Sequence, residues 1–218
     1  VNIQSVNTAD NSYAKSGDDI RVTFTASENL STSTPPTGTI QGLDATVAAV
    51  NGSQTNYTST IGTDGNTSEG NVSLALAFQD PAGNTATVNG SNDGSAVIFD
   101  RTIPSMTYVR MASNNDDDPT YANVGSLVTL TFKATDKLRG TPTVTIFSNN
   151  VTASGSNNDS LWSATATMVA DQVDGEIPFT LDFTDLASND GVQIVQVIND
   201  DDGVVTFDEV IPTLTQVS

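Results

Sequence analysis

The stretch Phe99-Asp100-Arg101-Thr102-Ile103-Pro104 returns 108 positions later as Phe207-Asp208-Glu209-Val210-Ile211-Pro212. The same displacement aligns Tyr13-Ala14 with Tyr121-Ala122 and Phe24 with Phe132. The chain therefore reads as a tandem duplication. The repeated hexapeptide marks a joint at the end of each copy.

Two domains follow from this repeat, because a copy of about 108 residues matches the size of a sandwich domain with its own core. We expect one domain at 1–104 and a second at 105–212. Val1, Val109 and Val217 share one register, so 213–218 is expected to begin a further repeat of a longer array.

The composition is strongly acidic, with 26 Asp and Glu against 7 Lys and Arg and a net charge of -19. Phosphate contacts need Lys and Arg, so nucleic-acid binding is excluded as a function. Such a surface repels anionic membranes and attracts divalent cations, and we expect no membrane contact by this segment. The chain has no Cys, so packing or a metal ion must replace disulfides.

Alternation of apolar and polar residues predicts the strands of both copies. Ile20, Val22 and Phe24 alternate with polar residues, and Val128, Leu130 and Phe132 repeat the pattern. Further strands are expected near 37–41, 57–61, 72–79, 143–146, 162–168 and 177–184, with last strands ending at Phe99 and Phe207. The inward positions predict a core that contains Phe24, Leu76, Phe78, Phe132, Leu181 and Phe183.

About seven short strands per copy, joined by turns, predict an all-β fold: two tandem immunoglobulin-like antiparallel β-sandwiches with Greek-key connections. The scarcity of Leu, Lys, Glu and Arg disfavours long helices. We expect almost no helix.

Three motifs occur in the same order in both copies. They are Ala26-Ser27-Glu28 or Ala134-Thr135-Asp136 after one strand, an Asp-x-Ala-x-Asn loop at 80–84 and 185–189, and the Phe-Asp-x-x-Ile-Pro joint. With these motifs the chain resembles the tandem bacterial immunoglobulin-like repeats of large cell-surface and adhesin proteins. The resemblance implies an extracellular spacer or stalk at the cell surface, whose partners are neighbouring repeats of the same chain.

Two other functions stay open beside the spacer. One is an adhesin module that recognises a surface glycan or protein through its loops, and the other is a subunit of a surface layer or filament. Many near-identical copies in the full protein would favour a spacer, whereas one divergent terminal copy would favour a binding module.

Catalysis is not expected, because without His and Cys the chain lacks the commonest general base and the thiol nucleophile. Asp171 and Asp174 are a possible acid pair for glycoside cleavage, but they lie in a turn-like stretch.

The remaining candidate residues have simpler interpretations. Lys133 lies at a strand position that is expected to point to solvent, which disfavours an internal Lys–Asn cross-link. Tyr57 and Trp162 could form a sugar-stacking platform, but their equivalent positions at a strand start indicate core aromatics with a polar contact at the rim. Eight Asn-x-Ser/Thr sequons, at Asn29, Asn51, Asn56, Asn66, Asn71, Asn89, Asn150 and Asn158, permit glycosylation without indicating a host.

The acidic residues in the loops suggest a Ca²⁺ site, because Ca²⁺ takes six to eight oxygen ligands and tolerates irregular geometry. In the second copy the expected ligands around the joint are Asp100, Asp136, Asp185, Asn189, Asp200, Asp201 and Asp202. The corresponding set in the first copy is Glu28, Asp80, Asn84 and Asp93. The alternative is that these are solvated turn residues, because Asp and Asn are also favoured in turns.

Overall fold

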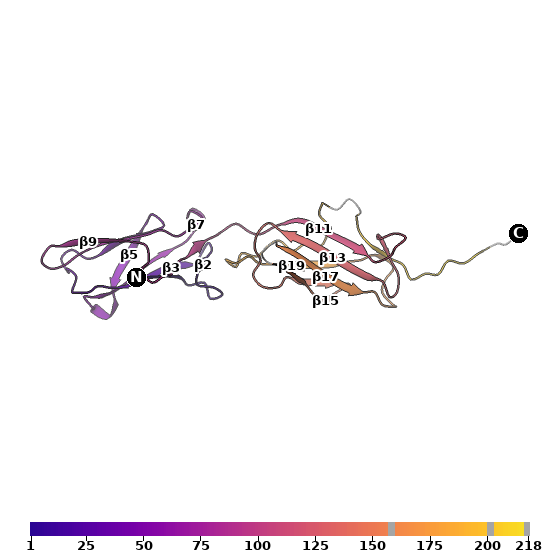
Figure 1. Ribbon diagram of the computed structural model, residues 1–218, viewed down its shortest axis with the longest axis horizontal. Coiled ribbons are helices and arrows are strands. Elements are labelled where there is room, and N and C mark those ends of the chain that lie inside the picture. The colour runs from indigo at the N-terminus through magenta and orange to yellow at the C-terminus, as the bar shows by residue number, and fades with distance from the viewer. Residues whose placement is uncertain (157–159, 200–202, 216–218) are drawn as a thin grey trace. The chain divides into compact units, whose positions relative to one another are not determined.

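The regular structure of the protein is almost entirely β-strand (Figure 1). The structure, a computed structural model, describes residues 1–156, 160–199 and 203–215. Within those ranges the one helical segment is a 3₁₀ turn, η1 at Val50–Gly52. Two compact units are present: Val1–Thr102 with Leu186–Asn189, and Ile103–Asp185 with Asp190–Ser218.

The first unit contains ten strands. They are β1 (Asn2–Ser5), β2 (Tyr13–Ala14), β3 (Asp19–Thr25), β4 (Thr37–Ile40), β5 (Leu43–Ala49), β6 (Asn56–Gly62), β7 (Gly70–Asn71), β8 (Leu74–Gln79), β9 (Thr85–Asn89) and β10 (Ile98–Phe99). Their order is β1-β3-β6-β5-β4-β8-β9, with a small sheet β2-β10-β7. Strand β5 pairs first with β4 and then with β6, so it passes from one layer of the sandwich to the other.

The described part of the second unit contains another ten strands. They are β11 (Met106–Ser113), β12 (Tyr121–Ala122), β13 (Leu127–Ala134), β14 (Thr143–Ile146), β15 (Asn149–Thr152), β16 (Ser154–Ser156), β17 (Leu161–Thr167), β18 (Gly175–Glu176), β19 (Phe179–Asp182) and β20 (Thr206–Phe207). Figure 1 shows β11, β13 and β17 side by side in this unit, in the sheet β11-β13-β17-β16. The other layer consists of β15-β14-β19 and β12-β20-β18.

Strand pairing matches the two units residue by residue. Phe24 lies opposite Tyr57 in the pair β3–β6, and Phe132 lies opposite Trp162 in the pair β13–β17. In each unit the last strand pairs in parallel with a two-residue strand near the start, β10 with β2 and β20 with β12. The chain also crosses between layers after β3 and β6, and after β13 and β17. This strand order confirms the predicted immunoglobulin-like Greek-key sandwich.

One hydrophobic core fills each sandwich. In the first unit Ile20 and Val22 from β3 are fully buried, and they share a cluster with Ile40 of β4 and Leu76 of β8. Two of the predicted core residues behave differently, since Phe24 is buried whereas Phe78 is only partly buried at the edge of this cluster. The prediction that Phe78 is a core residue was therefore wrong, because its side chain is only partly buried. The residue lies next to the end of β8 and lines a surface pocket.

In the second unit every predicted core residue is buried: Phe132 and Leu181 fully, and Phe183 to 94%, with 6% exposed. The sheets of this unit contribute to one cluster, which includes Trp162 and Phe207. In the strands predicted for this unit, the residues that were expected to point inward therefore lie in the core.

Candidate functional site

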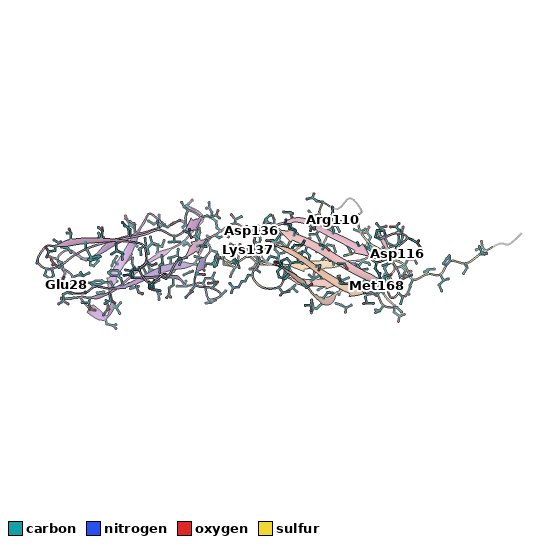
Figure 2. All side chains as sticks on the ribbon, in the orientation of Figure 1. Glu28, Arg110, Asp116, Asp136, Lys137 and Met168 are labelled. Atoms are coloured by element: carbon teal, nitrogen blue, oxygen red, sulfur yellow. The ribbon has the colours of Figure 1, made fainter. Side chains whose placement is uncertain are left out.

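Glu28, Asp80 and Asn84, three of the residues predicted to bind calcium, line one shallow pocket of the first unit. Its volume is about 400 Å³, and Leu30 and Phe78 contribute apolar lining. Glu28 follows β3 and is exposed at one end of the unit (Figure 2), while Asp80 and Asn84 belong to the turn between β8 and β9. The structure therefore brings these three oxygen-bearing side chains to one place.

The Asp-x-Ala-x-Asn motif is itself a closed turn. Asp80 accepts two hydrogen bonds from Asn84: Oδ1 from the backbone N–H at 2.8 Å, and Oδ2 from Nδ2 at 2.7 Å. The backbone N–H of Asp80 donates to the Asn84 carbonyl at 3.0 Å, and Gly83 adopts a φ of 97°, a left-handed value that glycine tolerates. The side-chain and backbone donors of Asn84 lower the pKa of Asp80.

Asp93 does not line this pocket. It caps the turn before β10, because its Oδ1 accepts from the hydroxyl of Ser95 at 2.6 Å and from the backbone N–H of Ser95 at 2.9 Å. The hydroxyl, that N–H and the side chain of Asn2 lower the pKa of Asp93 to about 2. The carboxylate of Asp93 therefore accepts the hydrogen bonds that are typical of an acid in a turn.

The acids predicted in the second unit occupy contrasting environments. Asp136 is exposed after β13, where its Oδ2 accepts from the Thr135 hydroxyl at 2.8 Å. Asp185 is only 2% exposed and forms an isolated antiparallel bridge with Leu138. Asn189 is also buried, but it belongs to the first unit, where its Nδ2 donates to the Asp100 carbonyl at 3.0 Å. Asp200, Asp201 and Asp202 lie outside the described residues.

Asp100 is half-buried at the end of the first unit and accepts the backbone N–H of Thr102 on Oδ1 at 2.9 Å. Across residues 1–156, 160–199 and 203–215, no group of three or more His, Cys, Asp or Glu side chains is arranged to hold a metal ion. Calcium binding by the loop acids stays a prediction.

Glu69 and Asp174 hold the joints, and the sequence reading did not assign them this role. The backbone N–H of Arg101 and the hydroxyl of Thr102 both donate to Glu69 Oε1, at 3.0 and 2.8 Å. In the second unit the backbone N–H of Glu209 donates to Asp174 Oδ1 at 3.0 Å. The available signal was a carboxylate directly before a glycine in each copy, Glu69-Gly70 and Asp174-Gly175, which lie 105 and not 108 positions apart.

The structure also places the remaining residues considered from the sequence. Lys133 is exposed, as its outward phase predicts. Tyr57 and Trp162 are both 7% exposed; the hydroxyl of Tyr57 donates to the Gln54 carbonyl at 3.4 Å, whereas Nε1 of Trp162 has no partner within the described residues. Both belong to the core rather than to an exposed platform. Seven sequon asparagines are exposed, and Asn158 lies outside the described residues.

No helix in the described part of the chain is long and apolar enough to cross a membrane. No protein-family model matches the sequence, and no curated protein matches it.

Two solved structures illustrate the matches found among known folds. The D00-D0 domain of Intimin is 10% identical, with 95% of this chain and 100% of that chain covered and a TM-score of 0.33. SGBP-B of the Bacteroides ovatus mixed-linkage glucan utilization locus, solved with a mixed-linkage heptasaccharide, is 16% identical over 90% of this chain and 43% of its own, with a TM-score of 0.24. Scores this low do not establish a shared fold, so the class assigned above comes from strand order.

Proposed function

We propose that this chain is a non-catalytic, extracellular spacer segment of a large bacterial surface protein. Each unit is then one repeat of an array that extends and presents other parts of that protein. Its partners are the neighbouring repeats.

The observation that supports this proposal best is that both units form a similar sandwich and bind the chain that leaves the sandwich in a similar way. Both units share the central strand orders, β1-β3-β6 with β4-β8 in the first and β11-β13-β17 with β14-β19 in the second. They also share the parallel pairing of the last strand and a carboxylate bonded to the backbone of the joint. An extended array needs the same backbone conformation after every repeat, because the segment between two repeats determines where the next repeat begins.

Absence of His and Cys from the sequence limits catalysis to carboxylates, Lys and Tyr. Asp174, one of the acids considered for glycoside cleavage, accepts the Glu209 amide in the structure, and this contact gives the residue a structural role.

Force spectroscopy on the 218-residue chain tests the spacer directly. Two independent repeats should unfold in two events. Each event should lengthen the chain by about 350 Å, because about 100 residues extend at roughly 3.3–3.6 Å per residue. A single cooperative event releasing the whole chain would contradict the division into repeats.

Binding and turnover panels test the alternatives. Incubation with peptide, ester and glycan libraries should give neither hydrolysis nor saturable binding. Saturable binding of one glycan or protein, lost when loop residues are exchanged, would replace the spacer by an adhesin module.

A further inference from the structure

We infer that two carboxylates at the exit of each unit form a clamp that directs the departing chain and orders the first joint as far as Thr102. In the first unit the clamp is Glu69 with Asp100, and in the second it is Asp174 with Asp208. The inference deepens the proposed spacer function and rests on it for its biological meaning.

Three successive amides of the first joint are bonded to the first unit. The N–H of Asp100 donates to the Ala14 carbonyl at 2.9 Å, and the N–H of Arg101 donates to Glu69 at 3.0 Å. The N–H of Thr102 donates to Asp100 Oδ1 at 2.9 Å, which closes a tight turn. The joint is therefore held by its own unit as far as Thr102.

The second unit repeats each of these bonds. The N–H of Asp208 donates to the Ala122 carbonyl at 2.9 Å, and that of Glu209 to Asp174 at 3.0 Å. The N–H of Val210 donates to Asp208 Oδ1 at 2.8 Å. Because Arg-Thr in one joint is replaced by Glu-Val in the other, these bonds do not depend on the side chains at the two positions after the joint aspartate.

A glycine places the first acid of each clamp. Gly70 and Gly175 follow Glu69 and Asp174, with φ values of 110° and 128°, and no atom within 4 Å of an added Cβ. They pair with Phe99 and Phe207, respectively, directly before the clamped residues. The conformation requires glycine, because L side chains rarely adopt this φ. It turns the chain into β7 or β18 immediately after the acid.

Charge-assisted hydrogen bonds, not the ion pair, make the clamp. Arg101 Nε lies 3.7 Å from Glu69 Oε1, but both side chains are about 40% exposed, and such surface pairs contribute little. The equivalent of Arg101 in the second joint is Glu209, which is acidic, and the amide bond to Asp174 is still present. The hydroxyl of Thr102 and the amide of Arg101 lower the pKa of Glu69, as expected for an ionised acceptor.

On the other side of the joint the chain is bonded to the second unit. The Ser105 N–H donates to the Thr135 hydroxyl at 3.1 Å, and the Thr135 N–H donates to the Ser105 carbonyl at 2.8 Å. Only Ile103 and Pro104 lie between these anchors and Thr102. Proline fixes its own φ and restricts the backbone of the residue before it.

Amide exchange and ¹⁵N relaxation of the 218-residue chain test the clamp. In the unmodified protein the amides of Arg101 and Thr102 should be as ordered as those of β3. Glu69→Ala should speed exchange at Arg101 at least tenfold, whereas Glu69→Gln should keep most of the protection because its amide oxygen still accepts. Asp116→Ala, which removes an exposed acid from the second unit, should leave exchange at Arg101 unchanged.

Asp174→Ala repeats the test at Glu209, and circular dichroism should show that both alanine variants stay folded. Unchanged exchange at Arg101 in Glu69→Ala, or amides at Arg101 and Thr102 as mobile as Thr213 in the unmodified protein, would overturn the clamp. Those results would leave the spacer function intact, while ligand binding or turnover would overturn the spacer without affecting amide exchange.

Discussion

Ser59 is the residue at which the two cores differ most plainly. Its side chain is fully buried opposite Val22, and its hydroxyl has no hydrogen-bond partner in the described residues. In the second unit the matching position, opposite Leu130, is Ala164, which is also buried. An unpaired buried hydroxyl keeps its full desolvation cost.

Ser59→Ala should therefore raise the free energy of unfolding of the first unit by about 1 kcal/mol. The reciprocal change, Ala164→Ser, should lower that of the second unit by a similar amount. Urea unfolding with an unchanged slope would measure both effects. A destabilised Ser59→Ala variant would mean that the hydroxyl has a partner.

Phe24 and Phe78 belong to the same unit but differ in depth, since Phe24 is 7% exposed and Phe78 only partly buried. Phe24→Ala should cost about 3 to 5 kcal/mol of unfolding free energy, the usual range for a buried phenylalanine. Phe78→Ala should cost less than half as much. Equal losses in urea unfolding would show that the end of β8 is covered as well as its middle.

At the scale of elements, the sequence pattern predicted the strands in which every second residue is fully buried. It missed strands in which no residue is fully buried. Strands β3 and β13 were found because every second residue is buried. Strands β5 and β9 have no fully buried position, although Ala45 and Val47 of β5 pack partly buried against the core. Their alternation is carried by few large apolar residues, so it is a weak signal, and backbone pairing defines these strands.

The same reasoning explains what was predicted of the candidate site. The Asp-x-Ala-x-Asn loop is local, and its turn residues identify it. The clamp joins Glu69 to Arg101, which are distant along the chain, and only the pairing of β7 with β10 brings them together.

The turn between β8 and β9 leads to a prediction about pH. Asn84→Ala removes the side-chain donor to Asp80 Oδ2 and keeps the backbone donor to Oδ1, so it should raise the pKa of Asp80 part of the way towards its ordinary value of about 3.9. The contribution of this lowered pKa to stability is present above the ordinary value and is lost as pH falls through the lowered one. Carboxyl ¹³C titration by NMR would measure the change. Asp93, held near a pKa of about 2 by Ser95 and Asn2, should not move in the same variant.

At the scale of the whole molecule, the net charge of -19 acts on any bound cation in two ways. Diffuse attraction to the acidic surface is screened over about 8 Å at 0.15 M salt, whereas ligation by several oxygens at a site is screened much less. Titration in 0.15 M KCl therefore separates a calcium site from general attraction.

The loop acids are predicted to bind Ca²⁺ with a dissociation constant of about 10⁻⁴ to 10⁻³ M, the range of extracellular sites. Calcium at tenfold excess over that constant should stabilise the protein by about 1.4 kcal/mol. Asp136→Asn should weaken the calorimetric binding signal, whereas Asp116→Asn removes an equal charge from an exposed residue at the opposite end of the second unit and should not (Figure 2). If both variants bind equally, or the unmodified chain gives no heat at millimolar calcium, the acids serve as solvated turn residues. The carboxylate clamp would then order the joint without metal.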